Sequence, residues 1–101
     1  MSFTHITIRE NSRLAKIAAW KLGVKSVAFT LGKTIHLYKA SAAEFLNNEK
    51  WLRHELKHVE QFRQHGYINF VLRYLAETLK HGYYDNKYEV EARRAEEMKV
   101  K

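Results

Sequence analysis

The sequence contains no cysteine, and this absence removes several kinds of chemistry at once. Disulfide bonds, thiolate metal sites and a cysteine nucleophile are excluded, so a transition metal would have to be bound by histidines and carboxylates. Proline is also absent, and only four glycines occur among 101 residues. No apolar run approaches the roughly 20 residues that a membrane-spanning helix requires, so no membrane span is expected.

The composition is that of a folded globular protein. Hydrophobic residues make up 46% of the chain and charged residues 29%. A chain of 101 residues has room for one core, which predicts a single domain over residues 1–101. The first residues do not combine a basic segment with a following apolar one, so we expect no signal peptide and, by default, a cytoplasmic location.

Positive charge is concentrated in the first part of the chain. Residues 1–40 contain seven Lys and Arg and one Glu, a net charge of +6, whereas residues 41–101 contain eleven and ten, a net charge of +1. A basic surface can attract nucleic acid, an acidic peptide or an anionic membrane. The basic residues do not alternate with aromatic ones as a stacking platform requires, so nucleic-acid binding is not favoured. A solvated lysine-rich surface is the simpler interpretation.

The hydrophobic pattern of the first 40 residues predicts a small antiparallel or mixed sheet with one helix. The predicted elements are a short strand over residues 3–8, a helix over 13–22 with Asn11 or Ser12 as its cap and Gly23 as its stop, and two strands over 24–31 and 34–38 joined at Gly32-Lys33. His36 alternates with apolar residues in the last of these strands and is expected to face solvent.

The rest of the chain predicts three helices, which makes the fold α+β. Ser41 and Glu44 form a capping-box signature that opens a long helix ending at Gly66. Residues 68–81 form a second amphipathic helix, a loop follows, and residues 87–99 form a highly charged third helix. Six aromatic residues at helical spacing are interpreted as core: Trp20, Phe45, Trp51, Phe62, Phe70 and Tyr74.

Residues 54–58, His-Glu-Leu-Lys-His, form the pattern H-E-x-x-H in the middle of the predicted long helix. The four-residue spacing places His54 and His58 on one helix face, where both rings can bind one ion. Zinc accepts nitrogen and oxygen ligands, lowers the pKa of a bound water, and would allow Glu55 to act as general base. The motif is short and the chain has six histidines, so the alternative is a solvated polar face. Apolar residues on both flanks favour the metal site.

A third ligand has to come from outside this motif. A metzincin would need Gly and His further along the same helix, but Gln61 and Gln64 stand there, which excludes that class. His65 has the wrong spacing and precedes Gly66, which is typical of a helix-end cation. The other solution is an acidic residue from a later helix, and residues 88–95 offer several.

The H-E-x-x-H motif followed by an acidic helix resembles the gluzincin metallopeptidases. The resemblance is carried by residues 54–61, His-Glu-Leu-Lys-His-Val-Glu-Gln, then a helix, then Glu89-x-Glu91-Ala92. More narrowly, the chain resembles the minimal bacterial and archaeal versions of about this length, including the minigluzincins and related domains of uncharacterised function. The likeness covers residues 41–96, and the N-terminal part matches only in outline. It implies a minimal zincin-like fold, a zinc cofactor and a peptide or protein substrate.

In gluzincins a "glutamate helix" supplies the third zinc ligand through the pattern Glu-x-x-Ala-Asp or Glu-x-x-x-Asp. Carried over to this sequence, the resemblance makes Glu89 the third ligand, because Ala92 stands three residues after it. Glu91 and Asp85 are the alternatives. The Asp of the family, which orients a zinc-binding histidine, is replaced by Arg93, and this predicts weaker catalysis more than weaker metal binding.

The resemblance also implies two further parts of an active site. One is a Tyr or His that assists the oxyanion, for which Tyr84 is the candidate, with Tyr67, His81 and Tyr83 as alternatives. Each of these aromatics can equally be a packing or surface residue. The other is an edge strand that aligns an extended peptide, and residues 34–38 are the candidate.

Two functional hypotheses follow. The first is a zinc-dependent metallopeptidase in which His54, His58 and Glu89 bind zinc and Glu55 activates water for attack on a peptide carbonyl. The second is a zinc-binding or regulatory module without turnover, favoured by the small size of the chain and by Arg93. Neither hypothesis specifies the substrate or the oligomeric state.

Overall fold

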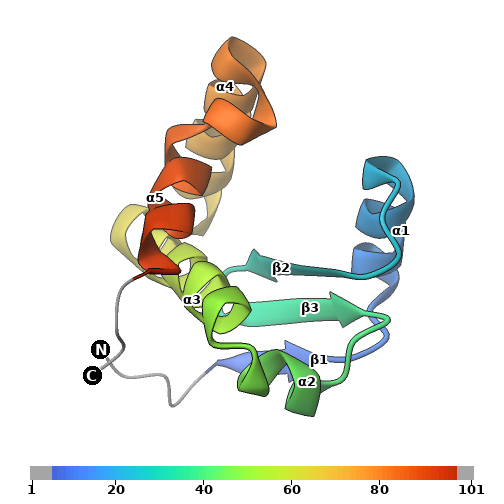
Figure 1. Cartoon of the computed structure of the whole chain (residues 1–101). Helices are drawn as coiled ribbons and strands as arrows, with labels where there is room; N and C mark the ends of the chain where they lie inside the picture. The colour runs from blue at the N-terminus through green and yellow to red at the C-terminus, as the bar shows by residue number, and fades with distance from the viewer. Residues whose placement is uncertain (1–5, 98–101) are drawn as a thin grey trace.

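The structure, a computed structural model, describes residues 6–97 and has the predicted α+β class (Figure 1). Its elements, in chain order, are β1 (Thr7–Arg9), α1 (Arg13–Leu22), β2 (Val27–Leu31), β3 (Thr34–Tyr38), α2 (Ala42–Asn47), α3 (Glu49–His65), α4 (Tyr67–Asp85) and α5 (Lys87–Ala95). None of the helices described is both long and apolar enough to cross a membrane. The N-terminal part of the predicted strand over residues 3–8, and the end of the predicted helix at residue 99, lie outside the described residues.

The three strands form a mixed sheet in the order β1-β3-β2. β2 and β3 are an antiparallel hairpin, and the turn between them uses Gly32 at a φ of 63°, a conformation that glycine adopts without strain. β1 is parallel to β3, with Ile8 opposite Ile35. Such a parallel pairing needs a crossover, and α1 and β2 provide it. β3 is therefore central, and β2 forms an edge.

α1 begins and ends where the sequence predicts. The Ser12 hydroxyl caps its start by accepting a hydrogen bond from the Ala15 amide, and Gly23 ends it at a φ of 68°. Ala15 and Ala19 are buried against the sheet. The prediction that Trp20 is a core residue is wrong, because its side chain is 78% exposed. Trp20 is one step of about 100° around the helix from Ala19 and therefore points away from the sheet.

The predicted helix from Ser41 to Gly66 is wrong in one respect, because the structure divides it into α2 and α3 at Asn48. The capping box of Ser41 and Glu44 is present as predicted. Asn48 leaves the helical conformation, with φ −95° and ψ 93°, and its side chain accepts a hydrogen bond from the Trp51 amide. Asparagine competes for backbone partners in this way, so Asn48 ends one helix and caps the next.

The segment predicted as a loop before the last helix is mostly helical. α4 is kinked at Gly82, with φ 81° and ψ 168°, and continues for one more turn to Asp85. Asn86 is completely buried and holds the reversal into α5. Its side-chain Oδ1 accepts a hydrogen bond from the Tyr88 amide at 2.8 Å, and its Nδ2 donates to the Tyr74 carbonyl at 3.0 Å. These bonds turn α5 back against α3 and α4.

The core has two parts, and α3, which carries the H-E-x-x-H motif, contributes to both. The first joins the sheet to α2 and α3, and the second joins α3, α4 and α5. Their buried residues are Ile35, Leu37, Phe45 and Val59 in the first part, and Phe62, Phe70 and Tyr88 in the second. Of the other aromatics predicted as core, Trp51 and Tyr74 are half-buried.

His36 does not face solvent as predicted, because it lies in the central strand and is only 7% exposed. Its ring stacks on Phe29 with a centroid separation of 5.0 Å, and its Nδ1 is 2.8 Å from Oγ of Ser12. Burial, together with the charge of Arg9, lowers the pKa of His36. A strand covered on both faces does not show the simple alternation of an exposed one.

Candidate metal centre

α3 presents both histidines of the motif on one face. The ring centroids of His54 and His58 are 5.0 Å apart, as expected for residues one helical turn from each other. The side chain of His54 is 16% exposed and that of His58 is 8% exposed. Both histidine side chains are therefore largely buried.

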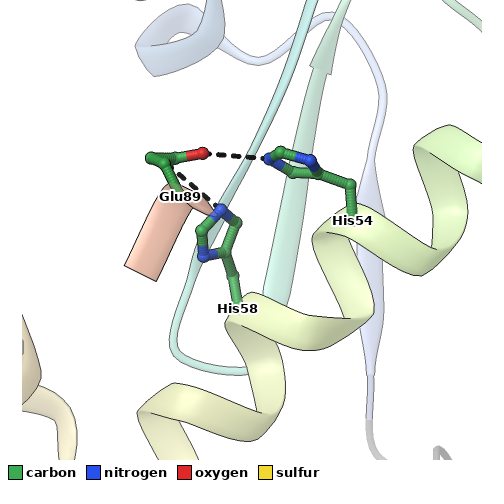
Figure 2. Close-up of side chains that lie close together, drawn as sticks. All are labelled: His54, His58 and Glu89. Carbon is green, nitrogen blue, oxygen red and sulfur yellow. Dashed lines mark hydrogen bonds and ion pairs between the residues drawn. The ribbon is translucent and has the colours of Figure 1, made fainter. Parts of the chain in front are cut away.

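Glu89 completes a group of three side chains. It lies in the first turn of α5, close to the Asn86 cap, and its side chain is 5% exposed. Its Oε1 is 3.0 Å from Nε2 of His54, and its Oε2 is 3.2 Å from Nε2 of His58 (Figure 2). One ligand atom from each of the three residues lies within 4.8 Å of the others.

The donor set fits a zinc ion. Two imidazole nitrogens and one carboxylate are the protein ligands of a common class of catalytic zinc site. Ligand atoms that surround a tetrahedral ion at about 2.0–2.1 Å lie about 3.3 Å from one another. The two separations between Glu89 and the histidines, 3.0 and 3.2 Å, are close to this value. Glu89 is thus placed where the sequence resemblance expects the third ligand.

The other nitrogen of each ring is held by a hydrogen bond. Nδ1 of His54 is 2.8 Å from Oε2 of Glu96, and Nδ1 of His58 is 2.8 Å from Oε1 of Gln61. An acceptor at Nδ1 keeps the proton there and leaves the Nε2 lone pair free for a metal. Gln61 is fixed in turn, because its Nε2 donates to the Tyr88 carbonyl at 3.1 Å.

Sequence reasoning missed Glu96. It follows the last residue of α5 and lies two helical turns after Glu89, so both carboxylates are on the same side of the helix. Nη1 of Arg53 donates to the Glu96 carbonyl at 3.0 Å, which holds this end of the helix against α3. Arg93, which stands where gluzincins have Asp, instead places its guanidinium 4.0 Å from the centroid of the Tyr84 ring. The carboxylate beside His54 is therefore supplied by Glu96, three residues after Arg93.

We predict that Glu96→Ala weakens zinc binding by about 10- to 100-fold, the usual effect of losing a partner that orients a metal-binding histidine. Competition with a chelating dye would measure the affinity. Glu97→Ala is the control, because Glu97 is its exposed neighbour and pairs only with Lys50 among the described residues. Equal affinities in the wild type and Glu96→Ala would show that His54 does not depend on this contact.

Glu55 lies next to this group but makes different contacts. It is only 4% exposed, and its Oε1 accepts a hydrogen bond of 2.9 Å from the hydroxyl of Thr30 in β2. Burial raises the pKa of Glu55, opposed by the neighbouring histidines. No hydrogen bond joins Glu55 to the two histidines or Glu89 among the described residues, so its second oxygen has no side-chain partner there. A buried carboxylate with an oxygen that has no side-chain partner in the site is placed to accept a proton.

The tyrosines of the site are not those that the sequence favoured. Tyr84 is 70% exposed and does not line the cavity, whereas Tyr83 and Tyr74 do. The Tyr74 hydroxyl donates to Oε2 of Glu89 at 2.5 Å, so this residue, predicted only as core, supports the third candidate ligand. Burial raises the pKa of Tyr83 to about 12, and both hydroxyls therefore stay protonated at neutral pH.

The alternative ligands lie elsewhere. Oε1 of Glu91 accepts a hydrogen bond of 3.1 Å from Nε2 of Gln61 and lies 3.7 Å from Nζ of Lys57. Asp85 is exposed at the end of α4. His65 stacks on Phe70 at the end of α3, with a centroid separation of 6.0 Å. Of the described residues, only His54, His58 and Glu89 form a group with metal-binding geometry.

A cavity of about 280 Å³ opens beside His54, His58 and Glu89. Its walls are mostly apolar and come from α1, β2 and α4, with Ala18 and Leu22 on one side and Val71 and Leu75 on the other. The candidate strand for peptide alignment, residues 34–38, is wrong, because β3 is paired on both edges. The edge strand at the cavity is β2, whose outer edge has no partner strand among the described residues.

Comparison with known protein families gives a match over the first two thirds of the chain. A family model described as the eCIS core domain matches residues 1–66, from the first strand to the end of α3, and so includes the complete H-E-x-x-H motif. No curated protein and no solved structure matches the chain. Glu89 and Glu96 lie beyond the matched segment. Because that segment covers more than half of the sequence, this chain belongs to the eCIS core domain family.

Proposed function

We propose that the protein is a zinc-dependent metallopeptidase of the gluzincin type. The observation that carries the proposal is the convergence of Nε2 of His54, Nε2 of His58 and the Glu89 carboxylate at 3.0 to 3.2 Å. The hydrogen bonds at Nδ1 of both histidines support it, because a metal site needs this tautomer. The cavity beside the group offers space for a substrate.

Zinc, when bound, would supply a Lewis acid that polarises the peptide carbonyl and lowers the pKa of water. Glu55 accepts a proton from water at its second carboxylate oxygen, which leaves a hydroxide. The Thr30 hydroxyl, hydrogen-bonded to the first oxygen, keeps the carboxylate oriented. The hydroxide adds to the carbonyl carbon, the carbon–nitrogen bond breaks, and Glu55 passes its proton to the leaving amine. One water is consumed, and a new carboxylate and a new amine are formed.

Tyr83 is our candidate for the residue that stabilises the oxyanion by donating a hydrogen bond. It lines the cavity, it is half exposed, and its raised pKa keeps its hydroxyl available as a hydrogen-bond donor. Tyr74 is less suited to this role, because its hydroxyl already donates to Glu89. Tyr84, favoured by the sequence, has its ring against Arg93 and lies outside the cavity.

The substrate that fits this site is an extended peptide segment with an apolar side chain. β2 offers the free backbone groups of an edge strand, to which an extended peptide can add by hydrogen bonding. The apolar cavity walls would take the side chain. Both features lie next to Glu55, because Thr30 of β2 is bonded to it.

We predict that Glu55→Gln retains zinc but loses peptide hydrolysis by about 100-fold or more, as expected when a general base is removed. Zinc content would be measured by elemental analysis, and cleavage by mass spectrometry of a peptide mixture. Glu60→Gln is the matched control, because Glu60 lies on the same helix and pairs with Lys57 outside the site. The proposal fails if the zinc-loaded wild type cleaves no peptide, or if Glu55→Gln cleaves as fast.

The alternative, a zinc-binding module without turnover, has one observation in its favour. The side chains of the three candidate ligands are only 5–16% exposed, so a bound ion would be largely enclosed by the protein. In that case zinc would hold α5 against α3 and would not catalyse a reaction. Stoichiometric zinc, cooperative unfolding on chelation and no cleavage of any peptide would identify this function.

A further inference from the structure

The outer face of α1 combines exposed apolar side chains with basic ones. Its residues recur at the helical spacing i, i+3, i+4, i+7 and i+8, on the side opposite the buried Ala15 and Ala19. We call this surface the α1 outer face. Its residues are Arg13, Lys16, Ile17, Trp20 and Lys21, and Val24 follows just after the helix.

The apolar residues of the α1 outer face are strongly exposed. Trp20 is 78% exposed, Ile17 is 57% exposed and Val24 is 47% exposed. α1 packs against β2 and β3 on its other side and projects from the sheet, apart from α3 and α5 (Figure 1). An exposed tryptophan with aliphatic neighbours is typical of an interaction surface, because its exposure lowers stability unless a partner covers it.

The charge around these apolar residues has a single sign. Residues 11–43 contain six Lys and Arg and no acidic residue. None of these six forms an ion pair with a carboxylate within residues 6–97. Lys16 and Lys21 flank the Ile17–Trp20 pair on its two sides, as their positions around the helix require. The partner of this face should therefore be both anionic and apolar.

We propose that the α1 outer face binds the surface of a membrane that contains anionic lipids. Trp20 suits the boundary between headgroups and acyl chains, where tryptophan is enriched, and Ile17 gains by burial there. The stems of Lys16 and Lys21 extend alongside while their amines reach the headgroup phosphates and carboxylates. Nucleic acid is a poorer match, because aliphatic side chains do not stack on bases and only one aromatic is present.

This binding is separate from the proposed peptidase chemistry, and Trp20 itself can report it. In a Trp51→Phe variant Trp20 is the only tryptophan, and because it is exposed its emission should move to shorter wavelength when it enters the lipid boundary. We expect this shift with vesicles made of equal parts phosphatidylcholine and phosphatidylserine, and none with phosphatidylcholine alone. Added salt should reverse it, because salt screens surface charge.

Variants of exposed residues separate the two contributions. Replacing both Lys16 and Lys21 by alanine should weaken vesicle binding by roughly 25-fold, since each basic residue near such a surface contributes about fivefold. Trp20→Ser should also reduce vesicle binding, which co-sedimentation would measure. Lys50→Ala is the control, because Lys50 is an exposed lysine on α3 and its loss should leave binding unchanged.

Three outcomes would overturn the proposal. They are no association with phosphatidylserine vesicles at low salt, equal association with vesicles of either composition, and loss of binding in Lys50→Ala equal to that in the double variant. A wavelength shift with a single-stranded oligonucleotide but not with vesicles would assign the face to nucleic acid instead. The Glu55→Gln variant should bind vesicles like the wild type, so failure of this proposal and failure of the peptidase proposal are distinguishable.

Discussion

Replacing Glu89 by alanine is expected to weaken zinc binding by on the order of 100-fold, whereas Glu91→Ala should leave it unchanged. Structural zinc sites with four ligands bind with roughly 10–16 kcal/mol, so one ligand contributes about 3 kcal/mol. Of these two residues, only Glu89 has its carboxylate within 3.2 Å of both Nε2 atoms. The Glu91 carboxylate accepts from Gln61 and approaches Lys57, away from the histidines.

The comparison of these two variants tests the register of α5. Both residues lie on the same short helix, so a general loss of helix stability affects them alike. Isothermal titration of zinc at constant pH would measure the affinities, and circular dichroism would verify that each variant is folded. Loss of affinity in Glu91→Ala with normal affinity in Glu89→Ala would show that α5 is rotated from the position described. Equal losses would show that neither carboxylate is the specific ligand.

Features that depend on neighbouring residues could be predicted from the sequence. The Ser12 cap, the Gly23 stop and the Ser41–Glu44 capping box each involve residues within one or two helical turns, and all are present. The spacing that places His54 and His58 on one face is equally local. The sequence predictions of α1 and of the α+β class are confirmed for the same reason.

Features that depend on distant contacts could not be predicted in this way. The break at Asn48 was missed because apolar spacing continues through it, and the conflict between helix and side-chain capping is not visible in hydrophobic periodicity. The central place of β3 depends on its pairing with β1, which α1 separates from it in the chain. Hydrophobic pattern alone assigned Trp20 to the core, although small Ala15 and Ala19 occupy the buried face.

Some residues of the candidate site could likewise be predicted from the sequence, and others could not. Family resemblance led to Glu89, but Glu96 and Tyr74 gain their importance only from the way α5 and α4 fold against α3. The one sequence signal for Glu96 is its spacing of seven residues from Glu89, which places both on one helix face. Arg93 by itself indicated a missing carboxylate. The structure changes this interpretation, because the Glu96 carboxylate already contacts His54 at 2.8 Å.

The metal-free protein is expected to lose stability when the pH rises from about 6.5 to about 9. Burial disfavours the charged form of His54, but hydrogen bonds to Glu89 and Glu96 and the charge of Glu55 outweigh it and raise the His54 pKa from 6.5 to about 9. A raised pKa gives stability that is complete below pH 6.5 and lost as the pH passes 9. The same contacts lower the pKa of Glu89, so its contribution is lost in acid, below its usual value of 4.5.

The size of this effect follows from the pKa shift of one ion pair. The rise of His54 from 6.5 to about 9 corresponds to about 3 kcal/mol. The shifts of His54 and Glu89 describe the same contact and are counted once. For a domain of this length, about 3 kcal/mol should lower the melting temperature by roughly 10–25 °C. Thermal unfolding followed by circular dichroism, with a chelator present, would measure the loss between about pH 6 and pH 9.

Zinc should remove this dependence. A metal ligand must be a neutral imidazole, so binding releases the proton that His54 holds below pH 9, and zinc affinity rises with pH over the same range. The zinc-loaded protein should therefore keep its stability between about pH 6.5 and pH 9, where the metal-free protein loses it. His54→Gln should flatten the metal-free profile, whereas His81→Gln, a change at an exposed histidine on α4, should preserve it. Parallel profiles with and without zinc would argue against His54 as a ligand, because a single side chain cannot hold a proton and a metal at the same nitrogen.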